Sequence, residues 1–560
     1  MMKKIWSRRN IIVFGFKFFG SSYLLALTPS QLKKNEESSS FLSHQETKNY
    51  PLYDCIVIGA GISGLTVADE LRGKSILVLE ASNRIGGRIY TDRTRYKGQV
   101  ERGAEYIHID PIDTPLWRKV SQYKLKMVKV KKINSYVFHS DLESEGILST
   151  ISTVFKLGFL NVLQIFNRLN YKSAVDLSAE EFLSSLKQTV NSKKDKILLD
   201  FKRMILSGHL GAPEDRLSMN GFRLDHISEQ LQAKFEYYIR NGYGSLVDQI
   251  SRDINIQLQE PVAKVTKIMP STSNNNFIYQ VTTETGKIYT AKSVCYSASI
   301  GVLKSNQIEF SPALPTKKIL AIQQLEMSHH TKIHLEFTER FWPNDMTMVN
   351  RIDQRRRMGK TYFVAYSDVP GALPTLTALI SGNDAIKLYS MTKEEMIENI
   401  CLDLEECFPE MGDIYKLLNV DADGKPNVML TQWNKNKFVR GGISYIKVNR
   451  ENSFPVELVR PTYASSEETP GLFWAGEAAA IYEQPASVHG AYSAGLRASV
   501  EIENFLNGNE LKDEKKIAQI YHEKFGFKNT MDWHADITRT PQNNNDDEQA
   551  WQDKFVPLFD

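Results

Sequence analysis

The sequence is poor in cysteine and carries almost no excess of charge of either sign. Four of the 560 residues are cysteines, and their positions show no spacing typical of a metal site. We therefore expect neither a bound metal nor a disulfide framework, and Cys55 and Cys295, which lie in apolar runs, should be buried thiols. The formal net charge of +3 is too small to indicate a nucleic-acid partner. The length allows two or more hydrophobic cores.

One long apolar segment, Asn10–Leu27, follows a basic start and is interrupted by Lys17. This arrangement has the shape of a secretory signal. The sequence Ser7-Arg8-Arg9 at its start resembles the twin-arginine export motif, a route that carries folded proteins. No clean cleavage site follows, so the alternatives are a retained membrane anchor or neither role. We expect an exported, periplasmic protein, with membrane association through the N-terminus as the main alternative.

The stretch Tyr53–Arg88 is predicted to form a strand, a turn, a helix and a second strand. A short apolar run opens it and suits a strand buried on both faces. A G-x-G-x-x-G motif follows, with apolar residues at helical spacing after it, and its glycines are Gly59, Gly61 and Gly64. The second apolar run, Ile76–Leu79, ends in the acidic residue Glu80.

Each part of this pattern suits a dinucleotide. Gly59 permits a tight turn, Gly61 lets the backbone approach a pyrophosphate, and Gly64 lets the helix pack on the sheet. The helix N-terminus offers unpaired N–H groups to phosphates, and Glu80 can accept hydrogen bonds from ribose hydroxyls. The alternative is a glycine-rich turn in an ordinary α/β unit.

The residues that follow indicate which dinucleotide is bound. The run Glu80-Ala81-Ser82-Asn83-Arg84-Ile85-Gly86-Gly87-Arg88 resembles the E-x-x-x-R-x-G-G-R run of FAD-dependent amine oxidases. In that family the arginines and glycines wrap the pyrophosphate, which suits the planar fork of arginine. The resemblance implies FAD as the cofactor and assigns cofactor contacts in this run to Glu80, Ala81, Arg84, Gly86, Gly87 and Arg88.

Further segments carry the same resemblance from about residue 53 to 505. Glu101–His108 resembles the E-x-G-A-x-W-I-H segment of polyamine oxidases, and Gly471–Glu477 and Val488–Gly495 resemble the family's L-F-x-A-G-E and H-G-A-Y-x-S-G runs. Gly442 stands where some relatives attach the flavin to a cysteine, so FAD should be noncovalent. The other implied cofactor contacts are Ser63, Gly103, Ala104, Glu105, Tyr106, Val262, Trp433, Gly476, Glu477, Ser487 and Val488.

Lys332 is the residue expected to take part in catalysis. It lies on a predicted strand, Thr331–Phe337, ten residues before Trp342. The family's lysine has the same spacing and holds a water at flavin N5. The alternative is a surface lysine, and the pattern implies no structural partner for the side chain. A metal site is not expected at His329, His330 and His334, because side chains diverge along a strand.

The substrate-binding residues implied by the resemblance are His108, Ile443 and Ser487. Ile443 and Ser487 stand where many monoamine oxidases place tyrosines around the amine, and Tyr106 stands where one branch of L-amino-acid oxidases has an arginine. The expected reaction oxidises a small-molecule amine to an imine and reduces oxygen to hydrogen peroxide. The alternatives are an L-amino-acid oxidase, a desaturase-like flavoprotein and a non-catalytic flavin-bound scaffold.

The predicted fold is α/β, α+β overall, with a Rossmann-type FAD-binding domain, a discontinuous substrate domain and a helical insertion. Helices are expected at Ser178–Leu186, Ile227–Tyr238 and Thr392–Phe408, and strands at Phe277–Thr283 and Lys287–Tyr296. The expected parts are a signal or anchor (1–30), a linker (31–50), three FAD-binding segments (51–115, 241–300 and 465–508), a helical insertion (116–240), a substrate domain (301–464) and a C-terminal extension (509–560).

Overall fold

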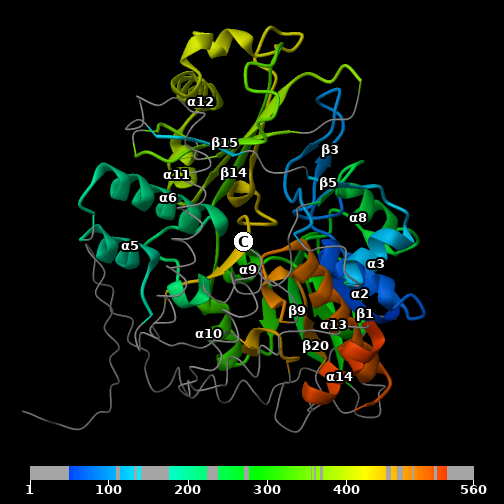
Figure 1. Cartoon of the computed structure of the whole chain (residues 1–560). Coiled ribbons are helices and arrows are strands. Elements are labelled where there is room, and N and C mark those ends of the chain that lie inside the picture. The colour runs from blue at the N-terminus through cyan, green and yellow to red at the C-terminus, as the bar shows by residue number, and fades with distance from the viewer. Residues whose placement is uncertain are drawn as a thin grey trace, which may run out of the picture.

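The predicted strand, glycine turn, helix and strand are present in the computed structural model, at the centre of an eight-stranded sheet (Figure 1). β1 (Leu52–Ile58) leads into α2 (Ile62–Glu70) and β2 (Ile76–Leu79), and the two strands pair in parallel. The structure describes residues 50–108, 114–130, 135–139, 176–188, 190–222, 237–269, 277–354, 356–358, 361–365, 370–448, 456–462, 471–481, 485–509 and 514–525. The predicted export segment lies outside these ranges.

The eight-stranded sheet gathers segments from distant parts of the chain. Along it the order is β12-β9-β10-β11-β1-β2-β8, and β20 also pairs with β11. β10 and β11 form the antiparallel pair predicted from the sequence. The additional strands are β8 (Ile256–Gln257), β9 (Val262–Ile268), β10 (Ile278–Thr283), β11 (Ile288–Tyr296), β12 (Glu309–Ser311) and β20 (Leu472–Trp474). Because β12 pairs with β9, this sheet also takes residues from the segment expected to belong wholly to the substrate domain.

Alternation along β1 places its side chains in two separate cores. Cys55 and Val57 face one core, which α2 shares with α13 (Val488–Leu506), and Ile56 and Ile58 face the other. Cys55 and Cys295 are buried thiols, as predicted. The helices on the first side also include α3 (Pro115–Gln122), α8 (Gly244–Ile250) and α14 (Glu514–Phe525), and those on the second are α9 (Ile300–Lys304) and α10 (Thr316–Gln324).

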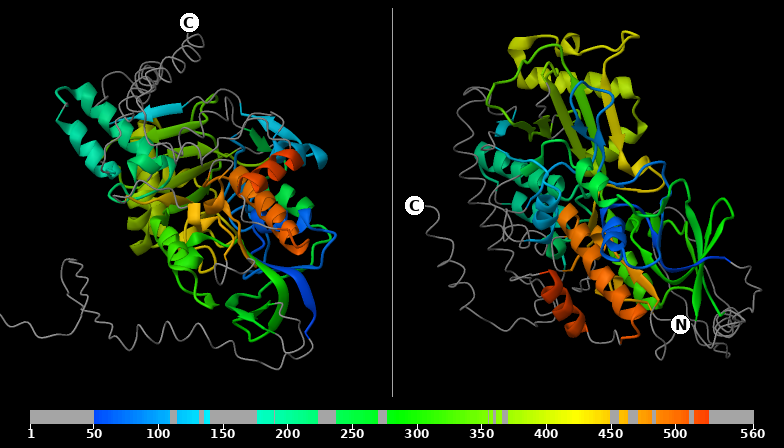
Figure 2. Two further views of the ribbon diagram at one scale, coloured as in Figure 1. Left: turned by 90° about the horizontal axis from the view of Figure 1, so that it is seen from below. Right: turned by 90° about the vertical axis from the view of Figure 1, so that its right-hand side faces the viewer.

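A six-stranded sheet forms the second lobe, in the order β18-β14-β17-β16-β15-β6. The right-hand view of Figure 2 separates this lobe, with α12 above, from the eight-stranded sheet and α13 below. α12 (Lys393–Cys407) packs its apolar face on the sheet. The strands are β6 (Ser135–Phe138), β14 (His330–Glu336), β15 (Met348–Arg351), β16 (Thr361–Val364), β17 (Thr375–Ser381) and β18 (Val428–Gln432). α11 (Gly382–Lys387) follows β17.

Two of the predicted helices, Ser178–Leu186 and Thr392–Phe408, lie entirely within the described ranges, and both are present. α12 begins with the predicted capping box, in which Thr392 Oγ1 accepts from the Glu395 N–H at 3.2 Å and the Glu395 carboxylate accepts from the Thr392 N–H at 2.7 Å. α5 (Ala179–Lys187) is also present and begins with a capping box at Ser178. No helix within the described ranges has the length and apolar character needed to cross a membrane.

The segment 116–240 differs from the predicted helical insertion because it also contributes strands. α5 and α6 (Lys193–His209) are helical, but β6 joins the second sheet, and β5 (Met127–Lys129) pairs with β7 (Tyr237–Ile239). The helix expected up to Tyr238 is therefore wrong at its end, where aromatic and branched side chains pair as a strand. The remainder of that helix, residues 227–236, lies outside the described ranges, as does the tail from residue 526.

Four short strands complete the framework around the site. β3 (Thr91–Asp92) pairs with β4 (Val100–Glu101), and β13 (Leu325–Met327) pairs with β19 (Ser444–Ile446). Short 3-10 helices occur at Leu388–Ser390, Pro409–Met411, Ile414–Leu417, Trp433–Lys435, Val456–Leu458 and Glu477–Ala479. Of these, Trp433–Lys435 follows β18, and Glu477–Ala479 follows β20 at the junction of the two lobes.

Candidate active site

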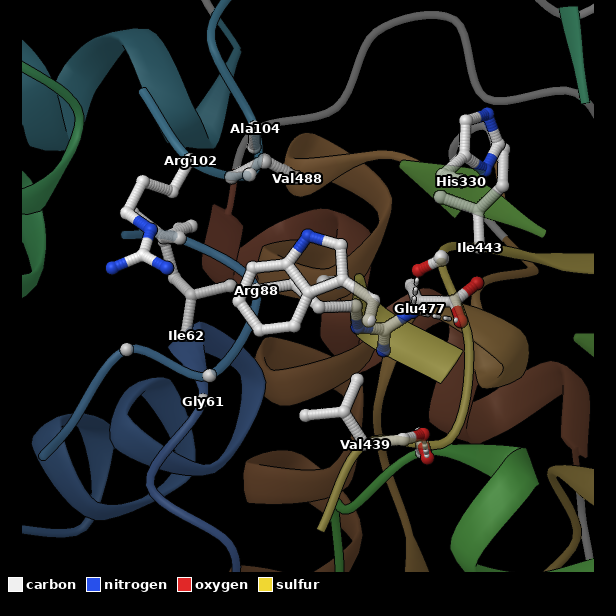
Figure 3. Close-up of a pocket in the computed structure, with 18 of the residues that line it drawn as sticks. Gly61, Ile62, Arg88, Arg102, Ala104, His330, Val439, Ile443, Glu477 and Val488 are labelled. Atoms are coloured by element: carbon white, nitrogen blue, oxygen red, sulfur yellow. Dashed lines mark hydrogen bonds and ion pairs between the residues drawn. The ribbon is translucent and has the colours of Figure 1, made fainter. Parts of the chain in front are cut away.

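A cavity of about 580 Å³ runs from the glycine turn after β1 to the strands of the second sheet. Figure 3 shows Gly61 and Ile62 on one side of it, and His330 and Ile443 on another. The predicted cofactor residues that line it are Gly59, Gly61, Ser63, Glu80, Arg84, Gly86, Gly87, Arg88, Gly103, Ala104, Glu105, Tyr106, Trp433, Gly476, Glu477, Ser487 and Val488. The three predicted substrate residues, His108, Ile443 and Ser487, line it as well.

The glycines of the turn have different surroundings. A Cβ added to Gly64 would lie 2.2 Å from the Gly59 carbonyl oxygen and 2.5 Å from Ser297 Oγ, so close packing requires glycine there. A Cβ on Gly61 would meet no heavy atom within 4 Å. Gly61 is the N-cap of α2, and the unpaired N–H groups of the first helical turn favour a negative group at this end. The open face at Gly61 and this helix end fit the pyrophosphate of a dinucleotide.

Glu80 lies where the second strand ends, and its carboxylate is fixed by the glycine turn. Its Oε2 accepts from the Ala60 N–H at 2.7 Å, and its Oε1 accepts from Ser82 N and Oγ at 2.8 and 2.7 Å. The residue is buried but lines the cavity. A carboxylate has about four lone-pair sites, so it can still accept from a ribose hydroxyl.

Arg88 joins the run Glu80–Arg88 to the run Gly471–Glu477, near the other end of the family match. Its Nη1 donates to Glu477 Oε1 at 2.7 Å and to the Gly442 carbonyl at 2.8 Å (Figure 3). The second carboxylate oxygen of Glu477 accepts from Ser444 Oγ at 2.6 Å. Arg84 instead donates to backbone carbonyls of its own loop, including that of Ile85 at 3.0 Å. The two arginines therefore hold the cavity wall together as well as supplying positive charge to it.

Lys332 lies on β14 and lines the cavity with its side chain 12% exposed, so it is not a surface lysine. Its ammonium donates to the carbonyl oxygens of Glu101 and Gly103 at 3.1 and 2.9 Å, and to Glu105 Oε2 at 3.0 Å. The expectation that it lacks a structural partner is wrong. Alternation along the strand predicts which face carries the lysine but does not show that the segment 101–105 covers that face.

Glu101 lies beside this lysine, but its carboxylate points elsewhere. It accepts from the Tyr243 N–H at 2.7 Å and from Thr91 Oγ1 at 2.9 Å. Burial raises the pKa of Glu101 to about 7, and these hydrogen bonds act in the opposite direction. The carboxyl group therefore titrates near neutral pH without lining the cavity.

The far wall of the cavity is mostly apolar. It is formed by Val130 and Leu210 from the insertion, Met348, Phe363 and Leu379 from the second sheet, and Ile443, which precedes β19. Polar residues on this side include Thr347 and His330, whose Nδ1 lies 2.8 Å from Ser328 Oγ. From the sequence, His330 was considered only as a metal ligand. His330 and Lys332 stand two apart on β14, so the period of a strand was the signal that could have found it.

Three predicted cofactor residues, Gly64, Ala81 and Val262, do not line the cavity described here. Gly64 packs beneath the turn, and Val262 begins β9 with its side chain in a core. Other lining residues were assigned no contact from the sequence, and pairing of distant strands brings several of them together; they include Arg102, Ser297, Ala298, Ser299, Asn436, Phe438 and Val439.

Cysteine and metal chemistry have no support at this cavity. All four cysteines are buried and none lines it, and burial raises the pKa of Cys55 to about 12. Within the described part of the chain, no group of three or more His, Cys, Asp or Glu side chains could hold a metal ion. Burial also keeps the pKa of His334 well below its ordinary value, so its ring is neutral.

Comparison with known proteins agrees with this geometry. Residues 62–503 match the family model described as flavin containing amine oxidoreductase. The chain is 28% identical to probable polyamine oxidase 4 of Arabidopsis thaliana over 465 residues, which cover 80% of this chain and 87% of that protein. It is 26% identical to polyamine oxidase 3 of Oryza sativa subsp. japonica over 460 residues, covering 80% of this chain and 88% of that protein.

Solved structures share the fold. The cyclohexylamine oxidase from Brevibacterium oxydans superposes with a TM-score of 0.64 at 20% identity, covering 82% of this chain and all of that one. A putrescine oxidase variant with redesigned cofactor binding superposes with a TM-score of 0.63 at 18% identity, covering 81% of this chain and 99% of that one. At these identities the superpositions show a shared architecture.

Proposed function

Because the chain belongs to the flavin-containing amine oxidoreductases, an FAD-dependent family that oxidises amines, we propose that its substrate is a primary or secondary amine with an apolar substituent. The reaction converts the amine to an imine, which hydrolyses to a carbonyl compound, and oxygen is reduced to hydrogen peroxide. FAD is held noncovalently, in keeping with the absence of any cysteine from the lining. FAD, when bound, supplies the redox chemistry, and the protein supplies position and electrostatics.

The choice of substrate rests on the charges along the described lining. Its three carboxylates are all engaged: Glu80 by the glycine turn, Glu477 by Arg88 and Ser444, and Glu105 by Lys332. Each of the three already has a polar or charged partner, so this lining offers no unpaired carboxylate to the extra ammonium groups of a polyamine, whereas the far wall offers Leu210, Phe363 and Ile443. An amine with a single charge and an apolar body fits this wall. The polyamine oxidase names of the relatives favour polyamines as the second candidate.

Different residues of the chain take different parts in this function. The glycine turn and the N-terminus of α2 would hold the phosphates of FAD, and Glu80 would accept from its ribose. We assign Lys332 as the catalytic residue, because its ammonium is a fixed positive charge in the wall of the cavity. Such a charge stabilises negative charge that develops on a neighbouring reacting group. His108, Ile443 and Ser487 would contact the amine.

A peroxide-release assay on FAD-loaded protein tests the proposal. The panel should contain monoamines with apolar substituents, di- and polyamines, and L-amino acids. We expect the highest kcat/KM for the apolar monoamines. A clear preference for polyamines would replace the substrate assignment, activity on amino acids alone would identify an L-amino-acid oxidase, and no peroxide with any amine would favour a non-catalytic flavoprotein.

We also propose that the protein is exported to the periplasm as a folded holoprotein. The support is the sequence Ser7-Arg8-Arg9 before an apolar segment, which lies outside the described residues. Changing Arg8 and Arg9 to lysine keeps the charge and should leave the protein in the cytoplasm, as measured by cell fractionation. Normal export of this double variant would exclude the twin-arginine route, and recovery of the native protein in the membrane fraction would favour the anchor.

A further inference from the structure

The ammonium group of Lys332 has three hydrogen-bond partners, as many as it has N–H donors. An ammonium carries three donors. They go to the carbonyl oxygens of Glu101 and Gly103 and to the carboxylate of Glu105, at 3.1, 2.9 and 3.0 Å. The first two acceptors are backbone carbonyls of alternate residues, which point to the same edge of an extended chain, and the third is the side-chain carboxylate of Glu105, two residues further on. The lysine therefore lies along the edge of the segment 101–105.

The backbone of this segment is held in place independently of the lysine. The Arg102 N–H donates to the Tyr90 carbonyl at 2.8 Å, and the Ala104 N–H donates to the Arg88 carbonyl at 3.1 Å. A Cβ on Gly103 would lie 1.8 Å from that same Arg88 oxygen and 3.1 Å from Trp433. Since the backbone cannot shift easily, the two carbonyl acceptors of Lys332 have fixed positions.

Glu105 is different from the two carbonyl groups in two respects. It is the one acceptor among the three that carries a full charge, and it is a side chain that can change rotamer. Lys332 and Glu105 both line the cavity, with 12% and 19% of their side chains exposed, so their charges are only partly screened by solvent. Glu105 therefore controls how much of the positive charge of Lys332 is compensated inside the cavity.

We propose that Glu105 is a positioning residue for the flavin reaction: by pairing with Lys332 it holds the ammonium at the cavity wall and sets how much positive charge acts on the flavin. The proposal rests on the role assigned to Lys332 above. A positive charge near the flavin favours the reduced ring, which carries more negative charge than the oxidised ring. The Glu105–Lys332 pair thus lowers the reduction potential relative to a free ammonium and keeps the site close to neutral.

The test measures the midpoint potential of FAD bound to the purified full-length protein. Glu105→Gln keeps the shape and one acceptor oxygen but removes the charge. We expect its two-electron potential to rise by about 30 mV, which corresponds to a tenfold change in the equilibrium constant. Glu105→Asp keeps the charge on a shorter side chain and should show a smaller rise. The measurement needs no substrate, so failure of every amine in the peroxide assay would leave it interpretable.

Two further variants separate positioning from other effects. Glu326→Gln is the matched control, because Glu326 is similarly exposed (22%) and pairs with Arg216 at 3.5 Å but does not line the cavity. Its potential should equal that of the native protein. In the Lys332→Met background the unpaired carboxylate of Glu105 still acts on the flavin, but no ammonium is left to be released or displaced, so Glu105→Gln should produce a smaller rise than in the native background. An unchanged potential in Glu105→Gln, an equal rise with and without the lysine, or loss of FAD from Glu105→Gln would each overturn the proposal.

Discussion

The two halves of the cavity are built from contacts of very different sequence range. On the nucleotide side, Gly64 packs on Gly59 five residues away, and Glu80 accepts from Ala60, 20 residues away. On the substrate side, the partners of Lys332 lie 227 to 231 residues away. The glycine turn and Glu80 are therefore encoded in one continuous stretch, to which the pairing of Arg88 with Glu477 adds one distant contact, whereas the surroundings of Lys332 exist only once the two sheets are assembled. We therefore expect substitutions in the glycine turn to impair folding or FAD binding, and substitutions around Lys332 to slow the flavin reaction.

The largest effect is expected in the glycine turn, from Gly64→Ala. Its new Cβ would lie 2.2 Å from the Gly59 oxygen, so backbone must move where α2 packs on β1. Overpacking of this kind costs about 3 kcal/mol or more when backbone is the obstacle. We expect little soluble protein and no bound flavin, measured by yield and by absorbance near 450 nm.

Gly61→Ala is the matched control for that prediction. The same methyl group meets no heavy atom within 4 Å, and Gly61 has φ −70°, which alanine adopts freely. The apoprotein should therefore be as stable as the native one, but its methyl group should obstruct the pyrophosphate and weaken FAD binding. Equal yield and equal flavin absorbance in Gly64→Ala and Gly61→Ala would contradict this assignment. They would show that Gly64 is not needed for packing in a way that differs from the need for Gly61 in FAD binding.

The nucleotide half could be predicted from the sequence because its geometry depends on short-range constraints. A strand, three glycines at fixed spacing and an acid at the end of the next strand admit few arrangements, and β1, α2 and β2 match the prediction. The spacing to Trp342 singles out Lys332, whose side chain lines the cavity; its part in catalysis stays a prediction.

The remainder could not be predicted because it depends on strand pairing between distant segments. β6 joins the second sheet beside β15, more than 200 residues later, and β7 pairs with β5 where a helix was expected. Short strands of three or four residues leave almost no periodic signal. The place of His330 in the cavity also depends on a contact between distant segments. Strand alternation puts His330 and Lys332 on one face of β14, but it does not show that the segment 101–105 and the cavity lie on that face.

The next largest effect is expected from Lys332→Met, which removes the charge from the substrate half but keeps the side-chain length. Either flavin reduction by the amine or reoxidation by oxygen should slow by roughly 10² to 10³-fold, as when one preorganised donor is lost. Stopped-flow absorbance, expressed per bound flavin, follows the two half-reactions separately. Native rates in both would contradict the catalytic assignment.

The same substitution should also lower stability, because it leaves two carbonyl groups and Glu105 without their donor. Each unsatisfied buried group costs about 1 to 3 kcal/mol, and partial exposure of this site favours the lower value. Denaturation of the FAD-loaded variant by urea measures this loss. A slow but fully stable variant would show that water replaces the ammonium along the segment 101–105.

The smallest effect is expected outside the cavity, at the start of α12 in the second lobe, where the sequence signal is local. Thr392 caps α12 through a reciprocal pair of hydrogen bonds with Glu395, all within four residues and exposed to solvent. Thr392→Ala should destabilise the first turn of α12 by about 1 kcal/mol, the usual loss for a removed N-cap. Hydrogen exchange in a peptide covering that turn should become roughly fivefold faster, because local opening is then less costly. Thr392→Ser keeps the hydroxyl and should exchange at the native rate, while bound FAD and both flavin half-reactions should be native in either variant. If Thr392→Ala instead altered either flavin half-reaction, the capping box of α12 would be coupled to the cavity. Locally encoded and assembly-dependent contacts would then not fail separately, as the comparison of the two halves predicts.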